Sequence, residues 1–239
     1  MQNNSIIRIA SIALVGALAL GVAQPSHAGL RDRMHRGESA NPVAAGSGRA
    51  PADRVIAGSG ANGSAAHAGG WIGNGNGGAI HYSGGAFRGA NGAHGWRGSS
   101  TNFGSDGSVR HQGGHSVTGA NGSYDNGHNS WTRNPDGSGS ASWQNNGQGA
   151  NGGGVNSGGS YTRGTDGKWT GSSSTTANGA KGSYSGSTSV NDGTGTHDTT
   201  ITNAAGDTYN GQTTWTKGQG YTHTGTCTDP QGNTISCGK

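Results

Sequence analysis

The sequence is punctuated by glycine turns at a fixed interval. Between residues 92 and 167 a turn glycine recurs every 15 residues, at Gly92, Gly107, Gly122, Gly137, Gly152 and Gly167. The residue before each of these glycines is alternately Asn, in the phrase Gly-Ala-Asn-Gly, and Asp, in the phrase Asp-Gly. The full repeat therefore spans two such intervals, about 30 residues, and a fixed period in this range is typical of repeat architectures, in which each unit packs against the next.

The segments between these turns have the pattern of β-strands. Asn-Gly and Asp-Gly favour tight type I′ hairpin turns, in which both central residues have positive φ. Residues 221–228 read Tyr-Thr-His-Thr-Gly-Thr-Cys-Thr, with Thr at every second position. Period-2 patterning with Thr, Tyr, Trp and Val, cut by such turns, predicts strands. The sequence predicts an all-β fold.

Two β architectures fit tandem strand-turn-strand repeats of about 30 residues. One is an antiparallel meander, with Ala-Asn-Gly turns along one edge and Asp-Gly turns along the other. The alternative is a β-solenoid with one repeat per coil. Hairpin-type turns favour the meander. The aromatic residues Trp71, Trp131 and Tyr161 lie at matching positions of their repeats, so we expect a stacked ladder of rings.

Composition leaves a largely disordered chain as a third alternative. Gly accounts for 52 of the 239 residues, and only 14 Leu, Ile, Val or Phe follow residue 28. So few aliphatic residues cannot form the continuous core of a helical or α/β enzyme. The periodic turns and the regular aromatic positions argue against disorder.

The first 28 residues have the three parts of a secretory signal peptide. Arg8 precedes an apolar run over residues 9–23, and small residues precede a predicted cleavage after Ala28. The alternative is an uncleaved membrane anchor, but the run is shorter than a bilayer requires. No second apolar run follows. We expect an exported mature chain without a membrane span, secreted or at the cell surface, meaning the periplasm or outer surface if the source is bacterial.

The rest of the chain divides into two parts. Residues 29–58 lack the repeat and carry five Arg and two Pro, which predicts a basic, flexible lead-in. Residues 59–239 form the β-repeat region. It ends with Cys227 and Cys237, and a turn at residues 229–232 is expected to bring the two sulfurs together as a disulfide clip. Without CxxC spacing, a redox-active or metal-binding pair is the weaker interpretation.

No motif indicates catalysis, a cofactor or a dedicated metal site. The chain has no GxSxG or HExxH sequence, and its glycine runs lack the strand and helix that flank a phosphate loop. One Asp-Gly per repeat is too sparse for calcium ligation. His111 and His115 are four residues apart, but we expect Gly113-Gly114 to break any strand that would align them. We therefore predict a non-enzymatic protein with no cofactor and no metal.

Charge and aromatic residues suggest surface contacts rather than nucleic-acid binding. The formal net charge is only +4 and the Arg residues are spread thinly, whereas a phosphate-tracking surface needs a denser stripe. Arg close to aromatic residues indicates candidate surface or glycan contacts at Trp131, Tyr161, Trp169, Trp215, Arg133 and Arg163. The competing interpretation is that the rings form the core and the Arg side chains are solvated.

The Gly-Ala-Asn-Gly and Asp-Gly phrases over residues 60–237 resemble secreted bacterial Gly/Asn/Thr-rich strand-turn repeat proteins. Curlin-type matrix fibres are the nearest functional analogy, although here the Gln residues fall irregularly. The resemblance implies self-association, for which open polar strands supply a mechanism. We predict an exported structural or surface protein in extracellular matrix, biofilm, adhesion or fibre formation.

Two functional alternatives stay open. The first is a glycan- or surface-binding module that uses Trp, Tyr and Arg rows to bind a polysaccharide or a cell-surface component. The second is a disordered, Gly-rich secreted protein.

Overall fold

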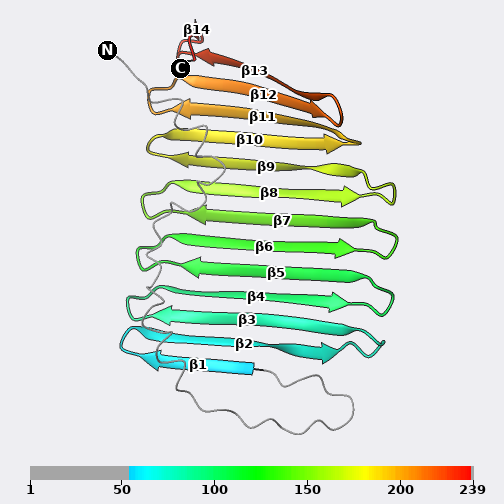
Figure 1. Cartoon of the computed structure of the whole chain (residues 1–239). Coiled ribbons are helices and arrows are strands. Elements are labelled where there is room, and N and C mark those ends of the chain that lie inside the picture. The colour runs from blue at the N-terminus through cyan, green and yellow to red at the C-terminus, as the bar shows by residue number, and fades with distance from the viewer. Residues whose placement is uncertain (1–53, 238–239) are drawn as a thin grey trace. The chain divides into compact units, whose positions relative to one another are not determined.

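A computed structural model describes residues 54–237. These residues form fourteen β-strands and no helix, and the strands follow one another in the sheet in chain order. Each hydrogen-bonded pair of neighbours is antiparallel (Figure 1). The antiparallel meander predicted from the hairpin turns is confirmed, and the solenoid is not what the chain forms.

The strands are of nearly uniform length, nine to eleven residues between β2 and β13. Their bounds are β1 Arg54–Gly60, β2 Gly63–Gly73, β3 Ala79–Gly89, β4 His94–Phe103, β5 Val109–Thr118, β6 Tyr124–Arg133, β7 Gly139–Gln148, β8 Gly154–Arg163, β9 Trp169–Gly179, β10 Gly182–Asn191, β11 Thr194–Asn203, β12 Thr208–Thr216, β13 Gly220–Thr228 and β14 Thr234–Ile235.

The described chain divides into two units, which we describe separately. The N-terminal unit comprises residues 54–141 and the C-terminal unit residues 142–237.

The first strand begins earlier than the sequence suggested. β1 starts at Arg54, inside the segment 29–58 that was assigned to the lead-in, and its Val55 and Ile56 pair with Ala68 and His67 of β2. This short apolar stretch precedes the first Gly-Ala-Asn-Gly phrase, so the repeat pattern could not reveal it. The predicted signal peptide and the remainder of the lead-in lie outside the described residues.

The regularly spaced turns are three-residue hairpin loops rather than type I′ turns. In the loop between β4 and β5, the Gly107 N–H donates to the Gly104 carbonyl (3.1 Å), and the Gly104 N–H donates to the Ser108 carbonyl (2.8 Å). Only Gly107 of this loop has positive φ, at 84°. This is a type I turn followed by a left-handed glycine, which forms a bulge. The expected type I′ conformation of these repeated turns is therefore wrong.

One turn does have the predicted type I′ character. Between β10 and β11 the two loop residues Asp192 and Gly193 have φ of 52° and 87°, and Asn191 pairs directly with Thr194. Asp192 is the single non-glycine residue with positive φ in the described chain. The loop is one residue shorter than the three-residue loops that carry Gly92 to Gly167, and both of its central residues lie in the left-handed region.

In the turns at Gly92, Gly107, Gly122, Gly137 and Gly167, the Asn or Asp before the glycine caps its own loop. The Asp106 carboxylate accepts the Ser108 N–H (2.9 Å), and the Asn91 side-chain oxygen accepts the Ala93 N–H (3.2 Å). Such side chains hydrogen-bond the backbone two residues further on. Within each unit the Ala-Asn-Gly turns lie at one end of the strands and the Asp-Gly turns at the other, as the sequence predicted.

The sheet has almost no conventional core. Among the described residues, the only buried hydrophobic side chains are Ile201 and Cys227. Aromatic rings lie directly over glycines instead: a Cβ atom on Gly195 would collide with the Trp215 ring, and one on Gly225 would collide with Tyr209. The glycines therefore let large rings lie flat on the backbone, which buries apolar area without a second layer.

Candidate binding and assembly surfaces

The C-terminal unit carries its aromatic residues on one face. Cross-strand partners in an antiparallel sheet point to the same side. The register places one row across β8 to β13, made of Tyr161, Gly171, Val190, Gly195, Trp215 and Tyr221. A second row on the same side contains Val155, Ala177, Tyr184, Ile201, Tyr209 and Cys227. We call the side defined by these two rows the ring face.

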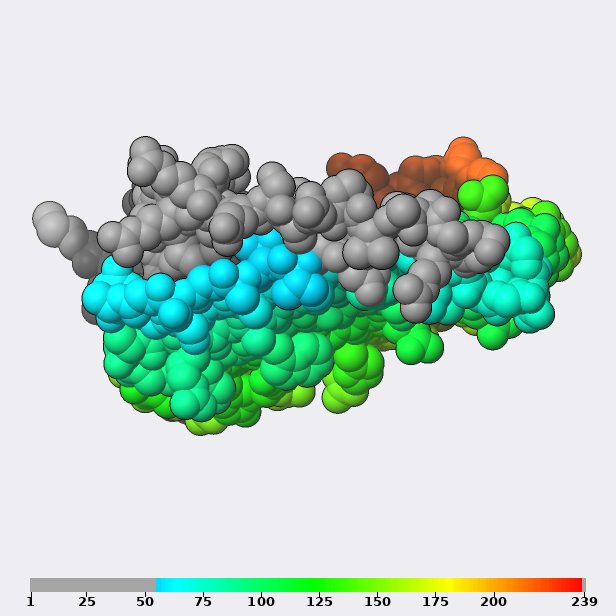
Figure 2. Space-filling view, turned by 90° about the horizontal axis from the view of Figure 1, so that it is seen from below, coloured from blue at the N-terminus to red at the C-terminus, as the bar shows by residue number. Residues whose placement is uncertain are grey.

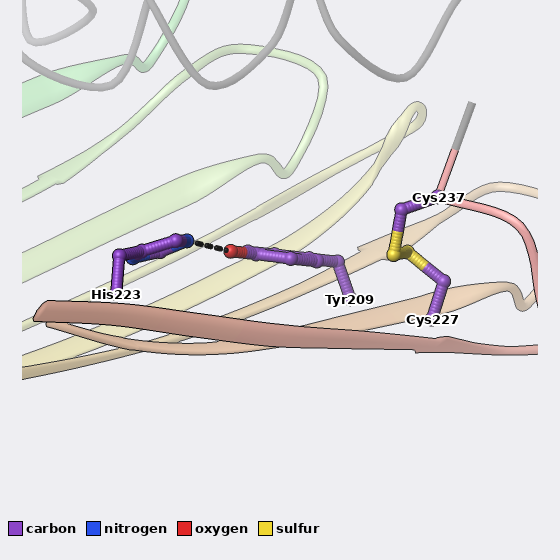
Figure 3. Close-up of a disulfide and its surroundings, with 4 residues drawn as sticks. All are labelled: Tyr209, His223, Cys227 and Cys237. Carbon is purple, nitrogen blue, oxygen red and sulfur yellow. Dashed lines mark hydrogen bonds between the residues drawn. A yellow bond between two sulfur atoms is a disulfide. The ribbon is translucent and has the colours of Figure 1, made fainter. Parts of the chain in front are cut away.

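Ring stacking and hydrogen bonds hold the ring face together. Trp143 stacks on Tyr161 with centroids 5.7 Å apart and planes 13° apart. The Tyr161 hydroxyl lies 3.0 Å from the Ser173 hydroxyl. Figure 3 shows Tyr209 lying along the sheet, with its hydroxyl 2.8 Å from Nε2 of His223. The phenol oxygens are thus satisfied while the rings cover the backbone.

The opposite side of the C-terminal unit consists of polar residues. Between β9 and β13 it carries only Ser, Thr, Asn, Gln, Asp and one Gly, and no aromatic or aliphatic residue. We call this side the hydroxyl face. Two of its rows are Ser172, Ser189, Thr196, Thr214 and Thr222, and Thr176, Ser185, Thr200, Asn210 and Thr226. All the aromatic and aliphatic residues of β9 to β13 therefore lie on the ring face, together with polar residues such as Ser173, Thr188 and Thr199.

Four of the six predicted contact residues lie together on the ring face. Tyr161 and Trp215 belong to its first row, and Arg163 pairs directly with Trp169. The Arg163 Nε donates to the Gly167 carbonyl (3.4 Å), which holds the guanidinium near the Asp-Gly turn. Trp169 is 44% exposed. Sequence spacing alone could not show that β9, β10 and β11 bring Trp215 to the same side as Tyr161.

The remaining two predicted residues, Trp131 and Arg133, lie on β6 of the N-terminal unit. They share a side with Trp71, because the register links Trp71, His81, Thr101, His111 and Trp131 in one row. We call this side the Trp71 face. The predicted direct ladder of Trp71 on Trp131 is wrong, since three strands separate them. Each indole contacts a histidine ring instead. Trp71 and His81 are tilted by 49° with ring centroids 4.7 Å apart, and Trp131 stacks on His111 with centroids 5.6 Å apart.

The histidines occupy regular strand positions. His111 and His115 both lie on the unbroken strand β5, so the expectation that Gly113-Gly114 interrupts the strand is wrong. His111 Nδ1 is 2.8 Å from the Thr101 hydroxyl and His115 Nε2 is 3.0 Å from the Asp125 carboxylate. Within residues 54–237 no group of three or more His, Cys, Asp or Glu side chains is placed to hold a metal ion.

The charged turn residues serve the turns. Hydrogen bonds from Ser138 lower the pKa of Asp136, and those from Ser108 lower the pKa of Asp106. Lys168 has a raised pKa because its ammonium group donates to Asp192 at 2.5 Å. These exposed groups stabilise the loops, either within one turn or, for Lys168 and Asp192, between two turns.

A surface hollow around Trp96 was missed by the sequence analysis. It lies on the side of the N-terminal unit opposite the Trp71 face, and we call this side the Trp96 face. The hollow has a volume of about 680 Å³, and its lining includes Ala57, Ala66, Ala86, Arg88, His94 and Trp96. The available signal was the short alanine pair at 65–66 and Ala86, but only the register shows that Ala66 and Ala86 lie in one row with Trp96.

The disulfide forms as predicted. Cys227 of β13 and Cys237 are bonded, with their Cα atoms 5.2 Å apart (Figure 3). Between them, Asp229 accepts the backbone N–H groups of Gln231 (3.0 Å) and Asn233 (2.8 Å). Hydrogen bonding, chiefly to the Asn233 side chain, lowers the Asp229 pKa. A structural disulfide of this kind indicates an oxidising compartment.

The described residues contain no helix that is both long and apolar enough to cross a membrane. No protein-family model, no curated protein and no solved structure matches the chain.

Proposed function

We propose that this chain is an exported, non-enzymatic structural protein that works at a surface or in an extracellular matrix by associating with copies of itself. The observation that carries the proposal is the segregation of the C-terminal unit into a ring face and a hydroxyl face. Sheets with one apolar and one polar side occur where the apolar side is covered and the other faces water. No described element covers the ring face.

The size of the ring face is sufficient for a stable contact. Strands β8 to β13 are about ten residues long and, at a rise of about 3.3 Å per residue and a spacing of about 4.8 Å, they cover roughly 800 Å². One partner contributes about this area to a standard protein–protein interface. Two ring faces packed about 10 Å apart would form a two-layer sandwich with hydroxyl faces outward.

The edges of the sheet offer a second route to association. Within the described chain, β1 pairs only with β2, and β13 pairs with β14 only at Cys227 and Thr228. Residues 220–226 of β13 are exposed. Figure 2 views the molecule from the side of β1, where the cyan β1–β2 hairpin forms part of the near surface. Open edges of this kind are templates for pairing with another strand.

A matched pair of variants distinguishes the ring face from the edge. Tyr221 is 79% exposed on the ring face, and Thr222 is the next residue of the same edge strand but points to the hydroxyl face. Sedimentation velocity of the exported protein should show concentration-dependent association. Tyr221→Lys should reduce it because a buried charge costs energy without a partner, whereas Thr222→Lys should leave it intact.

Each other outcome has a definite meaning. A wild-type protein that stays monomeric at every concentration contradicts the proposal. Equal loss in both variants assigns association to the edge of β13 and overturns the role of the ring face. If both variants associate as strongly as the wild type, the ring face near Tyr221 takes no part in association.

A second function is favoured by the same geometry. Tyr161, Trp169 and Trp215 share one face with Arg163, the arrangement expected of a glycan-binding surface. This alternative predicts saturable binding of a polysaccharide by the monomer. A loss of binding in Trp169→Ala, with association unchanged, would favour it over assembly.

A further inference from the structure

The Trp96 hollow has a floor of small residues. The register aligns Ala57, Ala66, Ala86, Trp96 and Ser116 in one row across β1 to β5. The alanines on three neighbouring strands have much shorter side chains than the indole beside them, so the surface is lower there. From Ala57 on β1 to Trp96 on β4 the row spans three interstrand steps, roughly 14 Å. This length suits an oligosaccharide better than a single small molecule.

Trp96 forms the platform at one end of the floor. The indole is 53% exposed, the highest fraction among the tryptophans with large exposure. It leans over Gly114 of the neighbouring strand, where an added Cβ would lie 3.4 Å from the ring. The indole therefore lies against the sheet at Gly114, while more than half of its surface stays exposed. An open, flat aromatic face attracts the C–H bonds of a sugar ring through its quadrupole.

The rim of the hollow is cationic and hydroxylated. The next row towards the Asn-Gly turns contains Ser59, Ser64, Arg88 and His94. Arg88 is exposed and always charged, whereas no Asp or Glu lines the hollow. A guanidinium with no carboxylate among its neighbours in the hollow is available for a bidentate contact with a ligand carboxylate.

We propose that the Trp96 hollow binds an acidic oligosaccharide, with a sugar ring stacked on Trp96, a uronate carboxylate on Arg88 and sugar hydroxyls near the serines. The site lies in the N-terminal unit and includes none of the ring-face residues. It therefore does not depend on the association proposed above.

The test compares an anionic ligand with its neutral methyl ester. The exported protein is titrated calorimetrically with an oligogalacturonate and with its methyl-esterified, neutral counterpart. We expect saturable binding of the acid and about tenfold weaker binding of the ester, because the charge-assisted hydrogen bonds to Arg88 are lost. Higher salt should weaken binding of the acid and leave that of the ester unchanged.

Matched variants locate the site. Trp96→Ala and Arg88→Gln should each weaken acid binding about tenfold or more. Arg97→Gln removes the same charge from the adjacent strand on the opposite face, and Trp71→Ala removes an indole there. Both controls should bind like the wild type. Circular dichroism and sedimentation of Trp96→Ala verify that fold and association are retained.

The outcomes separate this inference from the proposed assembly function. Absence of binding, equal binding of acid and ester, or equal effects of Arg88→Gln and Arg97→Gln overturns the acidic-oligosaccharide site. None of these results bears on association. Conversely, Tyr221→Lys should bind the acid normally even if its association is lost.

Discussion

The two units of the sheet use aromatic residues in different ways. In the C-terminal unit the rings gather on one side, while the other side is hydroxylated. In the N-terminal unit both sides carry rings, Trp71 and Phe103 on one and Tyr82 and Trp96 on the other. One unit therefore has the chemistry of half of a two-layer sandwich, and the other presents two mixed surfaces. The same turn-and-strand repeat supports both, because the two units place different side chains at the alternating strand positions that the register assigns to each face.

Substitution of glycine by alanine should change the free energy of unfolding most differently in the two units. Gly195 lies under the Trp215 ring, whereas the nearest atom to a Cβ on Gly98 is the Ser83 carbonyl oxygen at 3.8 Å. We expect Gly195→Ala to lower the free energy of unfolding by about 2 to 3 kcal/mol, because the indole must leave its position. Gly98→Ala should raise it by about 0.5 kcal/mol through reduced chain entropy.

Urea titration followed by circular dichroism measures both values. Similar destabilisation by the two substitutions would show that the ring-over-glycine packing of the C-terminal unit has no special role.

Removal of the disulfide should have the next largest effect, confined to the C-terminal unit. Cys237→Ser should lower the free energy of unfolding by about 2 kcal/mol, because the bond closes a short loop. Hydrogen exchange should accelerate in β12 to β14 and stay unchanged in β2 to β5. Reductant should reproduce the effect in the wild type and leave the variant unaltered. Faster exchange in β2 to β5 as well would contradict a local effect of the disulfide.

The turn aspartates should give the smallest effect. Asp136 accepts the Ser138 N–H and hydroxyl at 2.9 and 2.6 Å, and its pKa is below the ordinary 3.8. The pKa of Asp136 is lower in the folded chain than in the unfolded chain. Its contribution to the free energy of unfolding is therefore complete above the pKa of the unfolded chain and is lost as the pH falls through the pKa of the folded chain. Asp136→Ala should lower the free energy of unfolding at neutral pH. On acidification the variant should then lose less stability than the wild type does.

Asp136→Asn is the matched control, since Asn caps the equivalent turns at the opposite strand ends. It should retain neutral-pH stability and lose only the acid dependence. Thermal unfolding between pH 2 and pH 7 tests this, and an acid dependence unchanged in Asp136→Asn would contradict the assignment.

Much of the fold was readable from the turns. The regular spacing of Gly92 to Gly167 predicted the hairpins, their order and which turn lies at which end. Turn type was not readable, because Asp-Gly serves both the three-residue loop at Gly107 and the two-residue loop at Gly193. β1 was missed because the pairing of Val55 with Ala68 depends on a partner strand and not on any repeat phrase.

The candidate sites were predictable only in part. Tyr161, Trp169 and Trp215 were identified because Trp and Tyr are rare here and stand beside turns or Arg. Their common face depends on the parity of each loop, which a single residue of loop length reverses. The Trp96 hollow depends on Ala57, Ala66 and Ala86 meeting across three strands, and small residues give no signal in isolation.

The spacing of the turns has a consequence for how such a chain can change in length. In the N-terminal unit each three-residue loop pairs odd-numbered residues with odd-numbered ones, and the interval from one turn glycine to the next is itself an odd number. A residue one interval further along the chain therefore lies on the opposite face of the sheet and in a strand of opposite direction. A residue one full repeat further along has the same face and the same strand direction. Duplication or loss of DNA encoding a full repeat would lengthen or shorten the sheet and leave both faces in register. A change of a single interval would exchange the faces for every strand downstream. The sheet is built in steps of one strand, but its two faces are preserved only when strands are gained or lost in pairs.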